Sequence, residues 1–319
     1  MERTLVSVVM ITYAHEEFIQ QAINSILLQE GKFDLELIVA NDCSPDNTDN
    51  LIKEIIKNHQ KSGSVKYTRH TSNKGMSANV IWALEQAQGK YIALCEGDDY
   101  WTDDHKIQKQ LTFLENHIDY SLCCGGYISK NVITNENKEV IIKKYDKIDD
   151  KGFTFTLNEM SKEWITKTFT SFFRRDCLDF SMITKYAYFR DIHLFYHLMV
   201  FKKGYYFTTV FGVYNIHLAG VNSMQHGKVN LNASYNSYKE LHVQNKSEFT
   251  RDMYLKATLA LLSYDIHNPY INNTLKRRLG FFKEAIRLVG NVRETKWLLH
   301  SFFSRELKDK FKRNKTKGQ

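Results

Sequence analysis

Apolar positions along the first 116 residues alternate between two spacings. Short apolar runs rich in β-formers predict buried strands at residues 5–12, 35–40, 65–69 and 91–95. Apolar residues three or four positions apart predict helices between these runs, at 16–29, after Ser44, up to Ala87 and at about 104–116. Strand and helix alternating four times predict a mostly parallel sheet with helices on both faces.

The rest of the chain has a less regular pattern. We expect strands at 120–129, at 169–174 and, as one or two strands, at 205–217, with a helix over 191–202 that Gly204 ends. Residues 130–165 are polar and follow neither period, and only helical patterns come after residue 228. The predicted fold class is α/β, with one domain at 1–226 and a helical, basic C-terminal region at 227–319.

Three carboxylates follow the strand predicted at 91–95. They are Glu96, Asp98 and Asp99, and Gly97 between them lets the backbone bend sharply. Ligands of open α/β sheets bind beyond the carboxyl ends of the strands, where crowded carboxylates repel one another unless a cation lies among them. Oxygen ligands suit Mg²⁺ or Mn²⁺, which also bind phosphates. The alternative interpretation is an acidic surface turn.

Polar residues also end the first two predicted strands. Thr12 and Tyr13 end the first, with His15 and Glu16 just beyond, and Asp42 and Ser44 end the second. We expect all of them to meet the acidic cluster at one edge of the sheet. Asp42 is then placed to accept a hydrogen bond from a base imide or a ribose hydroxyl. Helix capping is the alternative for this segment, with Ser44 as the N-cap.

Several other classes of protein are disfavoured by the sequence. No GxGxxG follows the first strand and no GxxxxGK[ST] occurs, which argues against a Rossmann dinucleotide site and a P-loop. The five cysteines are odd in number and form no CxxC pair, so we expect neither a disulfide framework nor a zinc site. The N-terminus lacks a signal-peptide pattern and no apolar run approaches ~18 residues, which predicts a cytoplasmic protein.

The net charge of +8 comes from the C-terminal segment. Residues 271–319 hold 14 Lys and Arg against 4 Asp and Glu, so the remaining 270 residues carry −2, which argues against a nucleic-acid binder. Apolar residues lie among these cations and predict amphipathic helices: Phe281, Phe282, Ile286, Leu288, Val289, Trp297–Leu299, Phe302 and Phe303. Peripheral attachment to the cytoplasmic face of an anionic inner membrane and packing on the rest of the protein both stay open.

Six segments occur in a characteristic order over about residues 5–120. They are Val8–Tyr13, Ser25–Gln29, Asn41–Thr48, Asn73–Gly75 with Ala78 and Asn79, Gly89–Ile92, and Glu96–Asp99. The ordered set resembles family 2 glycosyltransferases of the GT-A fold. The resemblance implies that residues 1–120 bind a nucleotide-sugar, usually a UDP-sugar, through Mn²⁺ or Mg²⁺, and that residues 121–226 bind the acceptor.

The resemblance also implies roles for single residues of the nucleotide-sugar half. The nucleotide-sugar pocket is matched by Thr12, Tyr13, Glu16, Asp42, Ser44, Lys74, Glu96 and Asp98. Asp42 has the place of a uracil-contacting aspartate, and Asp98 and Asp99 match carboxylates on the ribose or metal side. Glu96 and Asn41 stand where the family has aspartates, so which carboxylate contacts the metal stays open.

The resemblance is thinner in the acceptor half. Asp191, at the start of a predicted helix, matches the catalytic base, and Trp101 is placed to pack on an acceptor sugar. His217 matches a histidine near the metal or diphosphate, although Asn215 stands in the place of an arginine. The alternatives are a helix N-terminal acid for Asp191, a core role for Trp101 and a structural role for His217.

Together these matches imply an inverting, metal-dependent glycosyltransferase. It would move a hexose or an N-acetylhexosamine to a glycan or lipid-linked acceptor in bacterial capsule, lipopolysaccharide or exopolysaccharide assembly. A non-catalytic glycan-binding or scaffold protein on the same fold is the alternative. A sugar-1-phosphate nucleotidyltransferase is disfavoured, because Tyr13–Glu16 is not the glycine-rich basic loop which that class has after its first strand.

Overall fold

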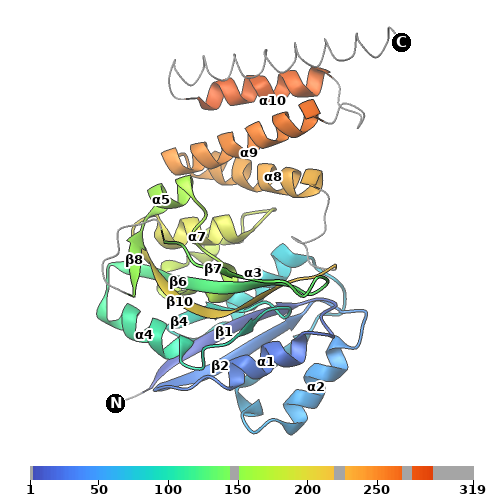
Figure 1. Ribbon diagram of the computed structural model, residues 1–319, viewed down its shortest axis with the longest axis vertical. Coiled ribbons are helices and arrows are strands. Elements are labelled where there is room, and N and C mark those ends of the chain that lie inside the picture. The colour runs from blue at the N-terminus through green and yellow to red at the C-terminus, as the bar shows by residue number, and fades with distance from the viewer. Residues whose placement is uncertain (1–2, 144–150, 219–226, 268–274, 290–319) are drawn as a thin grey trace. The chain divides into compact units, whose positions relative to one another are not determined.

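The computed structural model describes residues 3–143, 151–218, 227–267 and 275–289. The chain forms two compact units, Met1–Met224 and Gln225–Gln319. The first unit is built on a ten-stranded sheet in which eight strands follow the order β3-β2-β1-β4-β9-β6-β10-β5, with β7 beside β6 and β8 beside β10. Helices cover both faces of this sheet (Figure 1). The unit is therefore a layered α/β fold, as the sequence predicts.

The first half of the sheet is parallel, as expected. Its strands are β1 Thr4–Thr12, β2 Phe33–Asn41, β3 Val65–Arg69 and β4 Tyr91–Leu94. The helices of this half are α1 Ile19–Leu27, α2 Thr48–Asn58, α3 Met76–Gln86 and α4 Lys106–Asn116. Because the strands run the same way, their carboxyl ends lie at one edge of the sheet.

The second half of the sheet mixes directions. Its strands are β5 Tyr100–Trp101, β6 Tyr120–Asn131, β7 Asn137–Val140, β8 Gly152–Phe155, β9 Phe172–Arg174 and β10 Lys203–Ile216. β9 is antiparallel to both β4 and β6, while β10 is parallel to β6 and antiparallel to β5 and β8. Short helices complete the unit: η1 Ser62–Ser64, α5 Leu157–Lys162, η2 Thr168–Thr170, η3 Arg175–Cys177, α6 Phe180–Ile183 and α7 Asp191–Met199.

Two local predictions are wrong. α2 begins at Thr48 and not after Ser44, because the Ser44 hydroxyl binds Ala14 N–H and Asn41 Oδ1 and leaves the helix N-terminus to other residues. Gly204 does not end α7, which stops at Met199, but lies within β10. A Cβ at residue 204 would come within 2.4 Å of the Phe155 ring, so glycine is needed there for close packing.

A buried carboxylate fixes the start of β4 against the first two strands. Glu36 on β2 accepts hydrogen bonds from the Ser7 hydroxyl and from the backbone N–H groups of Gln88 and Gly89. The Lys66 ammonium lies 2.5 Å from its other oxygen. A buried charge needs such partners, and here they hold the turn before β4 in register with β1.

The second unit contains three described helices, α8 Gly227–Gln244, α9 Glu248–His267 and α10 Leu275–Leu288. α9 packs against both α8 and α10. Phe282 and Ala285 of α10 are buried with Leu262 of α9, and Phe281, Ile286 and Val289 pack against this cluster. These predicted amphipathic positions therefore face another helix of the same unit. Trp297–Leu299, Phe302 and Phe303 lie outside the described residues.

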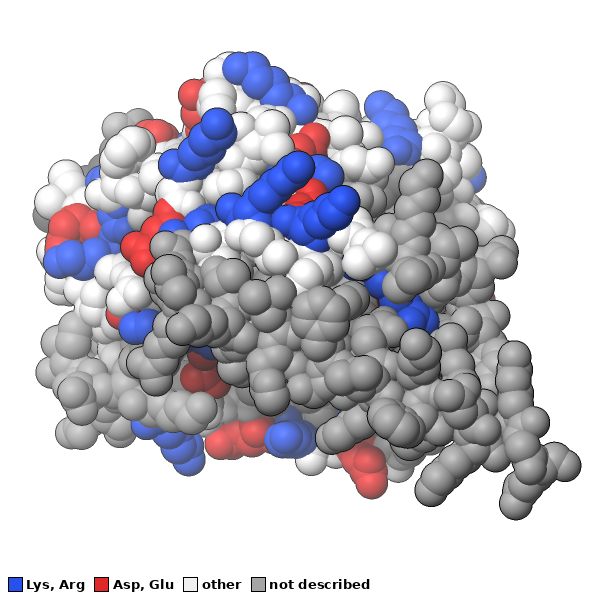
Figure 2. All heavy atoms as spheres, turned by 90° about the horizontal axis from the view of Figure 1, so that it is seen from above, with Lys and Arg blue, Asp and Glu red and all other residues white. Residues whose placement is uncertain are grey.

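The surface around these helices carries both signs of charge. In the view of Figure 2, Lys and Arg side chains are interspersed with Asp and Glu. Nine of the fourteen cations between 271 and 319, from Arg293 to Lys317, lie outside the described residues. Among the helices that the structure describes, none combines the length and apolar character that crossing a membrane requires.

Candidate active site

The loop after β4 lies directly against the end of β1. Its backbone passes so close that a Cβ at Gly97 would lie 2.7 Å from Thr12 Oγ1 and 3.1 Å from His15 Nδ1. The Gly97 N–H donates to the carbonyl of Ile11. Glycine is needed here for close approach, which brings Asp98 to the carboxyl end of β1.

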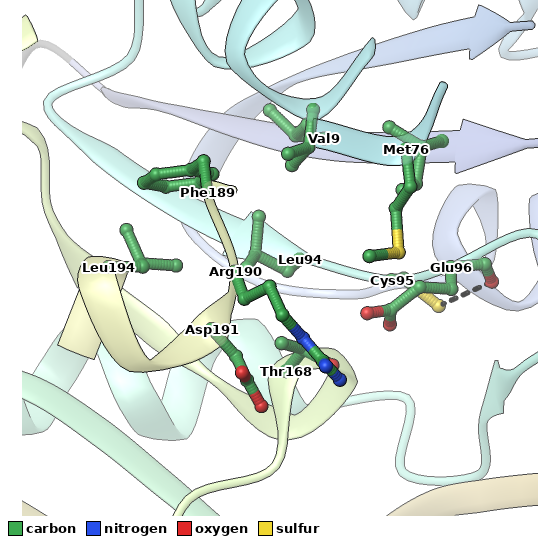
Figure 3. A pocket seen from close by; sticks show the side chains of 12 residues that line it. Val9, Met76, Leu94, Cys95, Glu96, Thr168, Phe189, Arg190, Asp191 and Leu194 are labelled. Atoms are coloured by element: carbon green, nitrogen blue, oxygen red, sulfur yellow. Dashed lines mark hydrogen bonds between the residues drawn. The ribbon is translucent and has the colours of Figure 1, made fainter. Parts of the chain in front are cut away.

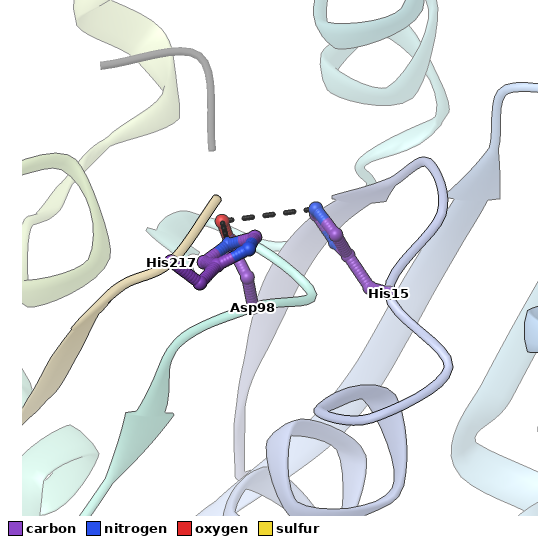
Figure 4. A group of neighbouring side chains, drawn as sticks. All are labelled: His15, Asp98 and His217. Atoms are coloured by element: carbon purple, nitrogen blue, oxygen red, sulfur yellow. Dashed lines mark hydrogen bonds and ion pairs between the residues drawn. The ribbon is translucent and has the colours of Figure 1, made fainter. Parts of the chain in front are cut away.

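Three side chains converge at this edge: His15, Asp98 and His217 (Figure 4). Asp98 Oδ2 lies 3.1 Å from His217 Nε2 and 3.7 Å from His15 Nε2. One ligand atom from each residue lies within 4.8 Å of the others, which is close enough for a common metal ion. His15 lies in the loop after β1, Asp98 in the loop after β4, and His217 directly after β10.

The chemistry of this donor set fits a divalent transition metal. Although burial raises it, the pKa of Asp98 is lowered on balance by the hydrogen bond from His217 and by nearby His15, so the carboxylate is ionised. Burial lowers the pKa of His15, which favours the neutral imidazole that binds metals. Two imidazoles and one carboxylate suit Mn²⁺ better than Mg²⁺, which prefers oxygen ligands.

His15 and Lys167 were not assigned roles from the sequence. A polar residue just beyond a strand end is the signal that pointed to His15, but only the fold brings it to Asp98. Lys167, just before η2, has its ammonium nitrogen 3.2 Å from the centroid of the Tyr214 ring. Burial lowers its pKa, whereas the carboxylates of Asp99 and Glu96 oppose this shift.

Asp99 lies outside the three-residue group, and its carboxylate has a structural partner. It is buried, and its Oδ1 accepts a hydrogen bond of 3.0 Å from the Asn215 N–H. The Asn215 side chain donates to the Asp98 carbonyl at 2.6 Å. Asn215 therefore ties the loop of residues 95–99, which we call the acidic loop, to the end of β10, where His217 follows. The expectation that Asp99 contacts a metal has no support in this geometry, which favours Asp98.

A cavity of about 120 Å³ connects the acidic loop with Asp191 (Figure 3). Glu96 and Asp191 both line it. Asp191 is the first residue of α7, and burial raises the pKa of its carboxyl group. Glu96 Oε2 is buried without a hydrogen-bond partner among the described residues. The candidate base and the acidic loop thus line one cavity.

The residues predicted to bind the nucleotide lie at the carboxyl ends of four strands: Thr12 ends β1, Tyr13 and Glu16 follow it, Asp42 and Ser44 follow β2, Lys74 follows β3, and Glu96 and Asp98 follow β4. The Asp42 carboxylate is buried and accepts from the backbone N–H groups of Lys74 and Gly75, at 2.7 and 2.9 Å. The Glu16 carboxylate accepts from the Asn47 N–H at 2.8 Å. Tyr13 is 45% exposed, so its ring is available to a ligand.

Trp101 is part of the core. It is 3% exposed, and its indole N–H donates to the Phe169 carbonyl at 2.7 Å. The Lys106 ammonium lies 4.0 Å from its ring centroid. This packing favours the core alternative over contact with an acceptor sugar.

Several curated proteins with sequences similar to this chain are named as glycosyltransferases. Putative teichuronic acid biosynthesis glycosyltransferase TuaG of Bacillus subtilis is 34% identical over 112 residues, 35% of this chain and 42% of the relative. UDP-Glc:alpha-D-GlcNAc-diphosphoundecaprenol beta-1,3-glucosyltransferase WfaP of Escherichia coli is 30% identical over 129 residues, 40% and 49% of the two chains. The chain spans about a third to a half of the length of such curated relatives.

Solved structures share the fold at low sequence identity. TarS 1-349 of S. aureus in complex with UDP-GlcNAc has a TM-score of 0.64 at 16% identity, covering 89% of this chain and 81% of that one. The mannosyltransferase PcManGT from Pyrobaculum calidifontis, in complex with GDP-Man and Mn2+, has a TM-score of 0.58 at 15% identity, covering 96% and 81%.

The family model described as "Glycosyl transferase family 2" matches residues 7–192, a span that includes the acidic loop and Asp191. Since this match covers more than half of the chain, the protein belongs to glycosyl transferase family 2.

Proposed function

We propose that this chain transfers a sugar from a nucleotide-sugar to an acceptor hydroxyl with inversion at the anomeric carbon, all within residues 1–226. One observation carries the proposal: the group of His15, Asp98 and His217 adjoins a cavity that Glu96 shares with Asp191. A diphosphate bound at His15, Asp98 and His217 and a base at Asp191 would face opposite sides of one sugar.

Asp191 is the proposed general base. As the acceptor oxygen bonds to the anomeric carbon, the Asp191 carboxylate takes the hydroxyl proton, and the bond between that carbon and the diphosphate breaks. A raised pKa suits this role, because a base is most effective when its pKa is near the working pH. Holding donor and acceptor side by side also orients them for reaction.

A divalent ion would neutralise the charge that develops on the departing diphosphate. His15, Asp98 and His217 would hold it, and their nitrogen atoms favour Mn²⁺ over Mg²⁺. Asp42 and Tyr13 are proposed to contact the base of the nucleotide.

The donor nucleotide is proposed to be UDP, and the acceptor a glycan or a lipid-linked sugar. The support is that WfaP is named for transfer from UDP-Glc to a diphosphoundecaprenol-linked acceptor, and that the TarS structure holds UDP-GlcNAc. The role of TuaG in teichuronic acid biosynthesis supports surface-polysaccharide assembly as the setting.

Calorimetric titration of UDP with and without Mn²⁺ tests the proposal. We expect UDP to bind in the presence of Mn²⁺, and the His217→Ala variant to weaken this binding by at least about tenfold. His59→Ala, at a partly buried position just beyond α2, is the matched control. Failure of UDP, GDP and CMP to bind under either condition would contradict the proposal and favour a non-catalytic protein.

A further inference from the structure

The cavity between the acidic loop and Asp191 has two chemically different sides. Its apolar wall is formed by side chains of β1, α3, β4 and the segment that enters α7: Val9, Met76, Val80, Leu94, Phe189 and Leu194. Arg190 and Asp191 lie beside one another on the other side, near Thr168. Glu96, which belongs to the acidic loop, lies at one end of the cavity (Figure 3). A ligand group that fits must therefore be partly apolar and partly polar.

The volume of the cavity limits what enters it. An apolar cavity of roughly 150 Å³ binds benzene, which has about six heavy atoms. At about 120 Å³ and open on one side, this cavity can surround only part of a hexose with its hydroxyl groups. It has the size of a single substituent of a few heavy atoms, with the sugar ring at its mouth.

The position of the cavity indicates which substituent this is. If the diphosphate lies at His15, Asp98 and His217 and the base is Asp191, the anomeric carbon must lie between them. In the arrangement that we infer, the substituent on the next ring carbon, C2, enters the space that Glu96 and Asp191 line. This step rests on the proposed function.

The lining matches an acetamido group better than a hydroxyl. A hydroxyl could bind the polar side, but it would leave the apolar wall without an apolar partner. The acetamido methyl suits Val80 and Leu194, its carbonyl can accept from Arg190, and its N–H can donate to the unpartnered Glu96 Oε2. We propose that the donor is a nucleotide-linked 2-acetamido sugar whose acetyl group occupies this cavity.

Calorimetry on the full chain with Mn²⁺ tests the proposal, using UDP, UDP-GlcNAc, UDP-GalNAc, UDP-Glc and UDP-Gal. We expect each acetamido donor to bind at least about tenfold more tightly than the hexose with the same ring configuration. Equal affinities, or a preference for the hexoses, would overturn this inference while leaving the nucleotide-sugar site in place. Absence of binding by UDP, GDP and CMP would instead overturn the proposed function, and this inference with it.

Two variants of Val80 test whether the preference for acetamido donors arises in this cavity. Val80→Trp should fill the cavity and remove the preference for acetamido donors, with UDP binding unchanged. Val80→Thr has almost the same shape but a polar hydroxyl, and should reduce the preference without the risk of misfolding. Val65→Thr, at a partly buried position on β3 outside the cavity, should retain it. A preference that survives both Val80 variants would overturn the assignment to this cavity.

Discussion

The proposed base offers a prediction about activity. Replacing Asp191 by Asn keeps the side-chain shape but removes the proton acceptor, so we expect transfer to fall by about 10²–10⁴-fold. Donor binding should stay within about twofold, since the residues proposed to bind the nucleotide lie on other loops. The two measurements are the initial rate of sugar transfer and the affinity for UDP with Mn²⁺, determined by calorimetry. A variant that transfers at the wild-type rate would show that another group takes the proton.

The environment of Asp191 also predicts a pH dependence. Burial raises the pKa of Asp191 in the folded protein, and the base must be ionised to act. Transfer should therefore rise with pH through a pKa above the ordinary Asp range. Because the ionised form is disfavoured in the folded state, wild-type stability falls as pH rises past the unfolded pKa of about 3.9. Asp191→Asn should raise the melting temperature at pH 7, unlike Asp34→Asn on the surface.

Lys106 offers a second prediction at this scale. It is fully buried, donates to Gln110 Oε1 at 2.7 Å, and burial lowers its pKa to about 7. The unfolded pKa is about 10.4, so between pH 7 and 10 the unfolded chain binds the additional proton and stability rises with pH. The slope approaches about 1.4 kcal/mol per pH unit for one such group.

Lys106→Met tests this by urea unfolding at several pH values. We expect the wild type to gain stability between pH 7 and 9 relative to the variant. The slope is the informative quantity, because the substitution also leaves Gln110 Oε1 without its donor, which costs about 1–3 kcal/mol at every pH. Parallel stability curves for the two proteins would mean that Lys106 is protonated throughout.

At the scale of elements, the end of β10 supports the acidic loop. Asn215 donates from its backbone to Asp99 and from its side chain to the Asp98 carbonyl. Residues that orient metal ligands without contacting the metal typically change metal affinity by about 10–100-fold. We therefore expect Asn215→Ala to weaken Mn²⁺ binding by that factor, measured by calorimetry. Asn116→Ala, at the exposed end of α4, should have no effect, and equal affinities in both variants would contradict the role.

The parallel half of the sheet was predictable because β1, β2 and β4 are mostly buried and read as short apolar runs, while β3 is a short run of β-forming residues. Strand β3 has the predicted bounds, and β1, β2 and β4 differ by one or two residues. This also located Asp42 and Asp98, since the carboxyl ends of parallel strands share one edge. The order and spacing of the sequence motifs indicated the family.

The other half was less predictable because its pairings are long-range. Antiparallel β9 lies between β4 and β6, and nothing local in its short sequence specifies those partners. His15, Asp98 and His217 lie far apart in the chain, so only the closed sheet brings them together. Trp101 was ambiguous for a related reason: an aromatic beside a motif has the same local pattern whether it packs on the core or on a ligand.

At the scale of the molecule, the residues of the candidate site all lie within Met1–Met224, whereas the excess of positive charge lies in residues 271–319. Within that unit, the apolar side of α10 packs on α9. Those side chains are therefore covered and are not free to enter a bilayer. If the chain attaches to an anionic membrane, the described helices favour attachment through charge over insertion of α10.

Attachment through charge has a distinct signature. Each Lys or Arg near an anionic surface contributes about 1 kcal/mol, and salt screens the attraction. We expect the full chain to co-sediment with phosphatidylglycerol-containing vesicles at low salt, to dissociate at about 0.5 M salt, and to ignore neutral vesicles. Changing four C-terminal cations to Gln should weaken sedimentation strongly: Lys308, Lys310, Lys312 and Arg313. The matched control changes four cations of the first unit: Lys53, Lys57, Lys61 and Lys138. Binding that resists salt would indicate apolar insertion, and no binding would leave contact with the rest of the protein as the interpretation of this segment.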